Sequence, residues 1–102
     1  LMNKQGEWSL APAFDVTYSY NPSGVWTATH QMTLNGKRDG FTREDFAACA
    51  KSALLKRGRA APIIEEVQAA VQRWPEFAAQ ARLADELRDK IHKTHRLAFA
   101  AK

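Results

Sequence analysis

The sequence lacks the features that form internal disulfides, transmembrane helices and phosphate-binding loops. Its one cysteine, Cys49, cannot form an internal disulfide. No apolar run approaches the roughly 20 residues of a transmembrane helix, and the N-terminus has no basic and apolar signal peptide. No glycine-rich loop that could cradle a phosphate is present. We therefore expect a cytoplasmic protein with no membrane contact.

What is present is the composition of an ordinary globular protein. Hydrophobic residues make up 45% and charged residues 25% of the chain, and its 102 residues allow one domain at most. The net charge is +4, and all of this excess falls in residues 42–102. It is too weak for a dedicated nucleic-acid binder. Weak DNA binding remains an alternative, and it would use Arg43, Lys51, Lys56, Arg57 and Arg59.

The first forty residues have the pattern of strands and loops. A turn signal that ends in Gly6 separates Leu1 and Met2 from an alternating segment, Trp8 to Leu10, which predicts a short N-terminal β-hairpin. Apolar and polar residues alternate again from Trp26 to Leu34, which predicts a second strand. Asn35-Gly36, the strongest turn signal in the chain, follows it.

From Thr42 onward the apolar residues follow a helical period. Thr42 and Asp45 have the spacing of a capping box, and Pro62 suits the first turn of the next helix. Pro75 separates that helix from a short one, and a last helix carries Leu83, Leu87, Ile91 and Leu97 on one side.

These patterns predict an α+β fold that is predominantly α. A short N-terminal hairpin or strand segment, residues 1–41, would be followed by a bundle of three to four helices, residues 42–102. We expect the two parts to form a single structural unit.

Few residues are candidates for chemistry. His92 and His95 lie three apart on the last helix, but neighbouring cations favour a solvated polar surface over a metal pair. His30 falls on the apolar side of its strand and is interpreted as a structural histidine. Cys49 lies among alanines, so we expect it to be a small buried apolar residue. No group is assigned as catalytic.

Asp15 is the remaining candidate. It lies between Phe14 and Val16, and an ionised carboxylate with apolar neighbours needs a charged or hydrogen-bonding partner. Mg²⁺ is one such partner, because it takes one or two carboxylates together with substrate phosphates. A turn or a helix cap is the alternative, and residue chemistry alone favours it.

A family resemblance adds to this. The segment from Gly6 to Val16, which contains Leu10-Ala11-Pro12-Ala13-Phe14-Asp15-Val16, resembles the end of the catalytic core of HipA-like serine/threonine kinases, the toxins of HipBA toxin–antitoxin modules. The stretch His30 to Gly36 is similar to one that follows in that family. Two later segments, Pro62–Val67 and Arg73–Ala78, are similar to its terminal helices.

The resemblance implies a role for Asp15 and a set of partners. Asp15 would bind Mg²⁺ on the phosphates of ATP, with Phe14 and Val16 packed around it. The implied partners are a HipB-like antitoxin or the remaining kinase segment, and a protein substrate of the complete enzyme. DNA would be reached only through the antitoxin.

The other catalytic parts of that family have no counterpart here. The nucleotide loop, the phosphate-binding Lys and the catalytic loop are missing from the 102 residues. We therefore expect a C-terminal fragment or domain that is inactive as a kinase and has no cofactor when isolated. A stand-alone helical interaction module, which docks on an antitoxin or a kinase fragment, is the alternative.

Overall fold

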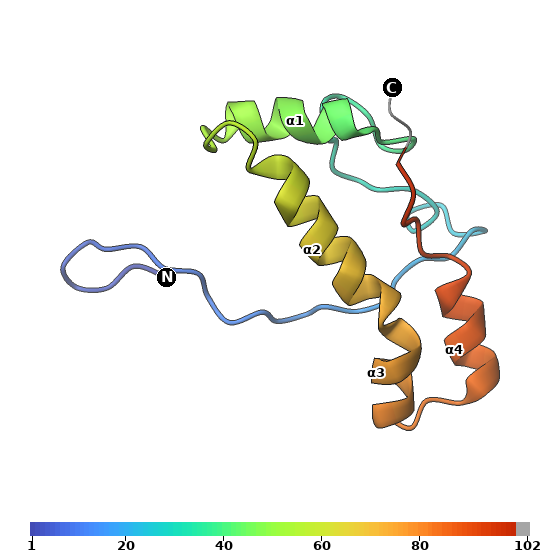
Figure 1. Ribbon diagram of the computed structural model, residues 1–102. Coiled ribbons are helices and arrows are strands. Elements are labelled where there is room, and N and C mark those ends of the chain that lie inside the picture. The colour runs from blue at the N-terminus through green and yellow to red at the C-terminus, as the bar shows by residue number, and fades with distance from the viewer. Residues whose placement is uncertain (100–102) are drawn as a thin grey trace.

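The computed structural model describes residues 1–99, and this part of the chain is mostly helical (Figure 1). Its helices are α1 (Arg43–Ser52), α2 (Ala60–Gln72), α3 (Trp74–Gln80) and α4 (Asp85–His92). Within residues 1–99, none of them combines the length and apolarity that a membrane crossing requires. The expectation of a predominantly helical chain with up to four helices is confirmed.

The helices pack in series along the chain. α1 contacts α2, α2 contacts α3, and α3 contacts α4. Figure 1 shows the result, with α1 crossing one end of α2, and with α3 continuing beyond α2 to lie beside α4. The described helices therefore form a curved row and not a closed bundle around one shared core.

Local sequence signals explain where most of these helices begin and end. The capping box at α1 is present, and the backbone N–H of Thr42 donates to Asp45 Oδ2 at 2.8 Å. After α1 the chain leaves the helical conformation at Leu54 and Gly58, which both have positive φ. Pro62 lies in the first turn of α2, as expected. α4 ends at His92, so Leu97 lies beyond the helix that was predicted to include it.

The predicted strands are wrong. In residues 1–99 the only β-type pairs are two isolated bridges, Met2 with Trp8 and Leu34 with Lys37. The first closes a small loop that lies apart from the helices in Figure 1, with no third strand to support it. Residues 21–28 curl into successive turns instead of pairing. Alternation without a partner strand did not suffice to form a sheet.

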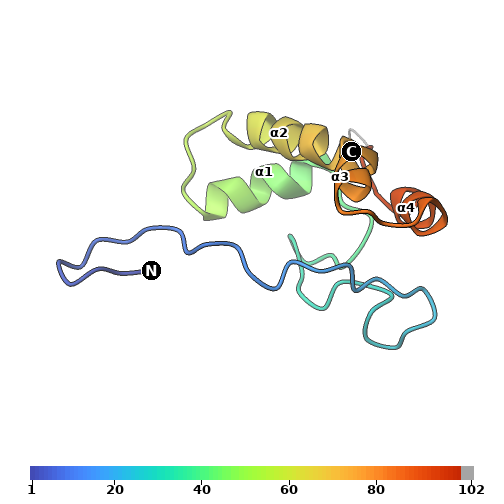
Figure 2. The same ribbon diagram turned by 90° about the horizontal axis from the view of Figure 1, so that it is seen from below.

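The chain is unusually open for its size. Its accessible surface is 8853 Å², whereas a folded monomer of this mass exposes about 5,800 Å². Its radius of gyration is 16.5 Å, against about 13 Å for a compact domain of this length. Figure 2 shows why, because the helices form one layer and residues 1–40 run along one side of it. In residues 1–99 only two apolar side chains are fully buried, Ala78 and Ile91.

Candidate functional site

Asp15 lies in an exposed segment that crosses from the N-terminal loop toward the helices. Its backbone has φ of 57°, in the left-handed region, which Asp tolerates better than most residues. Such a conformation costs about 1–3 kcal/mol and is found most often at turns and functional sites. The neighbours Phe14 and Val16 are exposed and do not pack around Asp15 as the resemblance implied.

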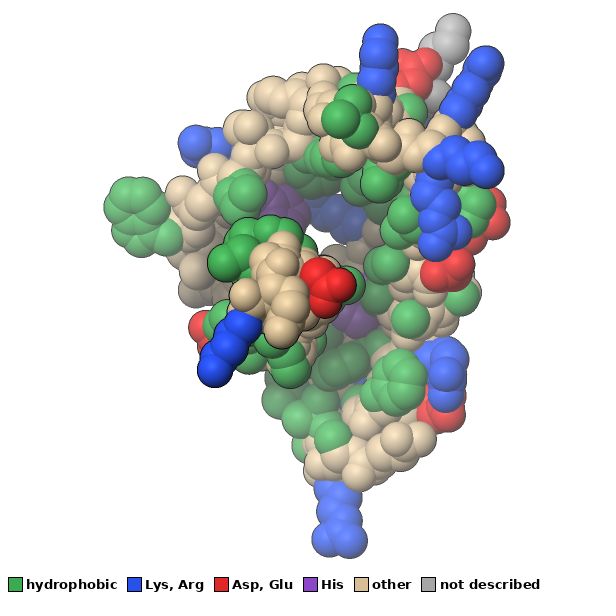
Figure 3. Space-filling model, turned by 90° about the vertical axis from the view of Figure 1, so that its left-hand side faces the viewer, with side chains coloured by type: hydrophobic (Ala, Val, Ile, Leu, Met, Phe, Trp, Pro, Cys, Tyr) green, Lys and Arg blue, Asp and Glu red, His purple; other side chains and the backbone are tan. Residues whose placement is uncertain are grey.

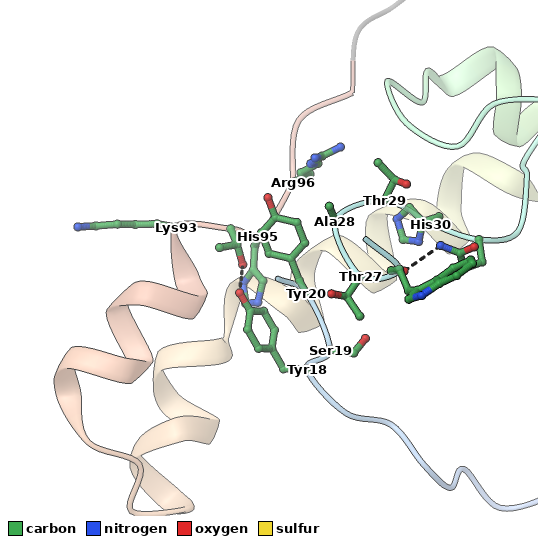
Figure 4. A pocket seen from close by; sticks show the side chains of 13 residues that line it. Tyr18, Ser19, Tyr20, Thr27, Ala28, Thr29, His30, Lys93, His95 and Arg96 are labelled. Carbon is green, nitrogen blue, oxygen red and sulfur yellow. Dashed lines mark hydrogen bonds between the residues drawn. The ribbon is translucent and has the colours of Figure 1, made fainter. Parts of the chain in front are cut away.

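This segment is attached to the helices three residues after Asp15. The hydroxyl groups of Tyr18 and Thr94 lie 3.2 Å apart and share a hydrogen bond, and Thr94 also donates to the carbonyl of Ile91 at 2.7 Å. Tyr18 and Tyr20 meet edge to face, with ring centroids 6.5 Å apart. Figure 4 shows Tyr18, Tyr20 and His95, which all line one pocket. The C-terminal end of α4 therefore fixes where the Asp15 segment meets the helical layer.

A pocket of about 720 Å³ lies beside this attachment. Two stretches that are far apart in sequence line it, residues 18–31 in part and residues 93–96 (Figure 4). Arg96 on its wall forms an ion pair with Asp39. The residues that line the pocket include no carboxylate, and Asp15 is not among them.

The three histidines fall in or near this region. His30 is exposed and tilts against Phe41 with centroids 5.6 Å apart, and the strand on whose apolar side it was expected does not form. His92 is exposed, in agreement with the polar-surface interpretation. His95 does not fit that interpretation, because it is half-buried and meets Trp74 edge to face at 5.7 Å. Burial, with a smaller contribution from His92, lowers the pKa of His95 below its ordinary value.

The most heavily bonded carboxylate is Asp45, not Asp15. Asp45 is 2% exposed and accepts hydrogen bonds from Asn35 Nδ2 at 2.9 Å and from Lys37 Nζ at 2.8 Å. Those bonds, together with the N–H of Thr42, hold the pKa of Asp45 well below its usual range. The predicted Asn35-Gly36 turn is confirmed, with positive φ at both residues. Its docking onto the start of α1 was missed.

Cys49 is exposed, so the expectation of a buried apolar side chain is wrong. Among the described helices, α1 contacts only α2. The cations that were named for weak DNA binding are brought together, because all five line one hollow between α1 and α2.

The residues fit a magnesium role for Asp15 only as one ligand among several. Among residues 1–99 no three His, Cys, Asp or Glu side chains gather in a way that could hold a metal ion. A single carboxylate is still consistent with Mg²⁺ held largely by substrate phosphates. Asp15 therefore has the donor chemistry of such a site but not a complete ligand set.

Comparison with known proteins supports the resemblance. The family model described as the HipA-like C-terminal domain matches residues 1–74, which include Asp15, the Asn35-Gly36 turn, α1 and α2. No curated protein and no solved structure matches the chain. Because the match covers nearly three quarters of the sequence, the chain belongs to the HipA-like C-terminal domain family.

Proposed function

We propose that this chain is the C-terminal part of a HipA-like serine/threonine kinase toxin and supplies Asp15 and the helical lobe to the complete enzyme. The observation that carries the proposal is the family match, which spans Asp15 and the segments on both sides of it. The complete enzyme would transfer the γ-phosphoryl group of ATP to a Ser or Thr of a protein.

Asp15 is the proposed ligand of Mg²⁺. The ion, when bound with ATP, neutralises charge on the phosphates during phosphoryl transfer. Two features of the chain suit Asp15 to this role. Its carboxylate lies on an exposed segment, and its left-handed backbone is of the kind found at functional sites. The Tyr18–Thr94 contact would hold this segment against α4.

The isolated chain is expected to be inactive. Phosphoryl transfer depends on several positioned groups acting together, and one carboxylate cannot replace the nucleotide loop, the Lys and the catalytic loop. The remaining kinase segment is the partner that would provide them. A HipB-like antitoxin is the second proposed partner, and DNA would be reached only through it. The unusually large exposed surface is consistent with a chain that is covered by such partners.

Reconstitution tests the proposal. The chain is co-expressed with the N-terminal segment of a HipA-like kinase, and co-elution in size-exclusion chromatography and ATP turnover are measured for each piece and for the mixture. We expect no turnover by the chain alone, co-elution of the two pieces, and turnover by their complex. Asp15→Asn should abolish turnover and leave co-elution unchanged.

Glu65→Gln is the matched control, because it makes the same carboxylate-to-amide change at an exposed position of α2. It should leave turnover unchanged. Asp15-dependent turnover by the chain alone, or full turnover by the Asp15→Asn complex, would overturn the proposal.

A further inference from the structure

The hollow between α1 and α2 is separate from the Asp15 segment. It has a volume of about 760 Å³ and is formed by one side of α1, the connecting loop and the first turns of α2. α1 has ten residues, so the hollow runs along about 15 Å of helix. Such a length matches about three turns of a second helix laid beside it.

The charge around this hollow is strongly one-sided. The five cations that line it are accompanied by one carboxylate, Glu44. The excess of four positive charges equals the net charge of the whole chain, so outside the hollow ten cations are balanced by ten carboxylates. Figure 3 shows Lys and Arg side chains gathered in this way at the upper right of the face it presents. The cations are Arg43, Lys51, Lys56, Arg57 and Arg59.

Part of the lining of the hollow is apolar. Leu54 is 91% exposed and Leu55 is about half as exposed. Both line the hollow, together with Ala47, Ala50 and Ile64. Leu54 has a positive φ, which turns the chain at the end of α1. An exposed apolar patch that is rimmed by polar residues is a common feature of a protein-binding surface.

We propose that this hollow, the α1–α2 groove, binds an acidic amphipathic segment of a protein partner. The apolar face of the segment would cover Leu54, Leu55 and the alanines, and its carboxylates would face the five cations. A phosphate backbone would meet the same cations, but it offers nothing apolar to cover the leucines, and the groove is lined by no aromatic side chain on which a base could stack. The observations therefore favour an acidic protein segment over a nucleic acid.

Peptide binding to the full chain tests this proposal. The probe is a fluorescent peptide of about 15 residues with leucines on one helical face and glutamates on the other. Binding is measured by fluorescence anisotropy against three controls: a peptide with Lys in place of Glu, a scrambled peptide of the same composition, and a DNA duplex of about 20 base pairs. The acidic amphipathic peptide should bind most tightly. Raising the salt concentration from about 0.05 M to 0.3 M should lower its affinity about tenfold.

Two variants separate the charged and the apolar contributions. Replacing Arg57 and Arg59 with Glu should lower the affinity for the acidic peptide about tenfold or more. Arg82→Glu, a charge reversal at an exposed position after α3, should leave this affinity unchanged. Leu54→Asn should lower the affinity for the peptide about fivefold. Asn tolerates the left-handed backbone at this position, and the side chain is too exposed for its loss to unfold the chain, as circular dichroism would verify.

Asp15→Asn should leave the peptide affinity unchanged. Peptide binding at the α1–α2 groove and the proposed role of Asp15 in the kinase are therefore tested independently of each other. Equal binding of the scrambled peptide, tighter binding of the DNA, or unchanged affinity in both groove variants would overturn the proposal.

Discussion

Ile91 is the residue whose truncation should most affect the attachment of the Asp15 segment. It is 6% exposed on α4, and α4 contacts only α3 among the described helices. Its carbonyl accepts the Thr94 hydroxyl, and Thr94 in turn shares a hydrogen bond with Tyr18. Loss of the Ile91 side chain therefore loosens the α3–α4 contact and the connection that leads back toward Asp15.

The size of the effect can be worked out from burial. Truncation of a buried Ile to Ala costs about 2–5 kcal/mol, and the lower end applies here because the open surroundings can collapse around the gap. A loss of about 2 kcal/mol lowers the melting temperature of a domain of this size by roughly 8–16 °C. Leu87 lies on the same helix but is 43% exposed, so Leu87→Ala should cost about 1 kcal/mol or less.

Thermal unfolding followed by circular dichroism at 222 nm measures both free-energy changes. Proton NMR of the Tyr18 ring reports on its attachment to Thr94. We expect a large shift in melting temperature and a changed Tyr18 signal for Ile91→Ala, and a small shift with no change at Tyr18 for Leu87→Ala. Equal shifts for the two variants would refute the packing argument.

Two further predictions concern titration. Lys37, Asn35 and Thr42 hold the pKa of Asp45 below its usual 3.8, so the stability that this carboxylate provides is present above that pH and is lost as the pH falls below it. Asp45→Asn should flatten this acid dependence in thermal melts from pH 2 to 6, and an unchanged acid dependence would contradict the assignment. His95 has a lowered pKa, so its neutral form stabilises the fold and this stability is lost as the pH falls below 6.5. His92→Gln should raise the pKa of His95 measured by NMR titration, whereas His30→Gln should not.

The helical half of the fold could be predicted because its signals are local. The capping box at Thr42, Pro62 at the start of α2 and the break before α3 depend on residues within a few positions of each other. Both boundaries of the last helix were misplaced, because α4 spans Asp85–His92 and leaves out Leu83 and Leu97, which were predicted to lie on it.

The first forty residues were predicted less well because a strand needs a partner. Alternation from Trp26 to Leu34 met no second strand in residues 1–99, and turns formed instead. The Asn35-Gly36 turn was predicted correctly, since its positive φ angles are a property of those two residues.

In the candidate site, too, the features that depend on neighbouring residues could be predicted, whereas those that depend on contacts between distant segments could not. Asp15 could be singled out from its neighbours and from the family resemblance. The Asp45 network could not, because it depends on the Asn35-Gly36 turn folding back onto α1. The convergence of five cations on one groove depends on how α1 packs on α2, and no periodicity shows that.

Asp15 is the proposed ligand of the nucleotide-bound metal in the complete kinase. Mn²⁺, which can replace Mg²⁺, broadens NMR signals near its site. The most direct measurement is an amide spectrum of the ¹⁵N-labelled chain, bound to an unlabelled N-terminal kinase segment, with ATP and Mn²⁺. We expect selective broadening at Phe14, Asp15 and Val16 that disappears in Asp15→Asn and persists in Glu65→Gln. Broadening that is centred elsewhere, or unchanged by Asp15→Asn, would contradict it.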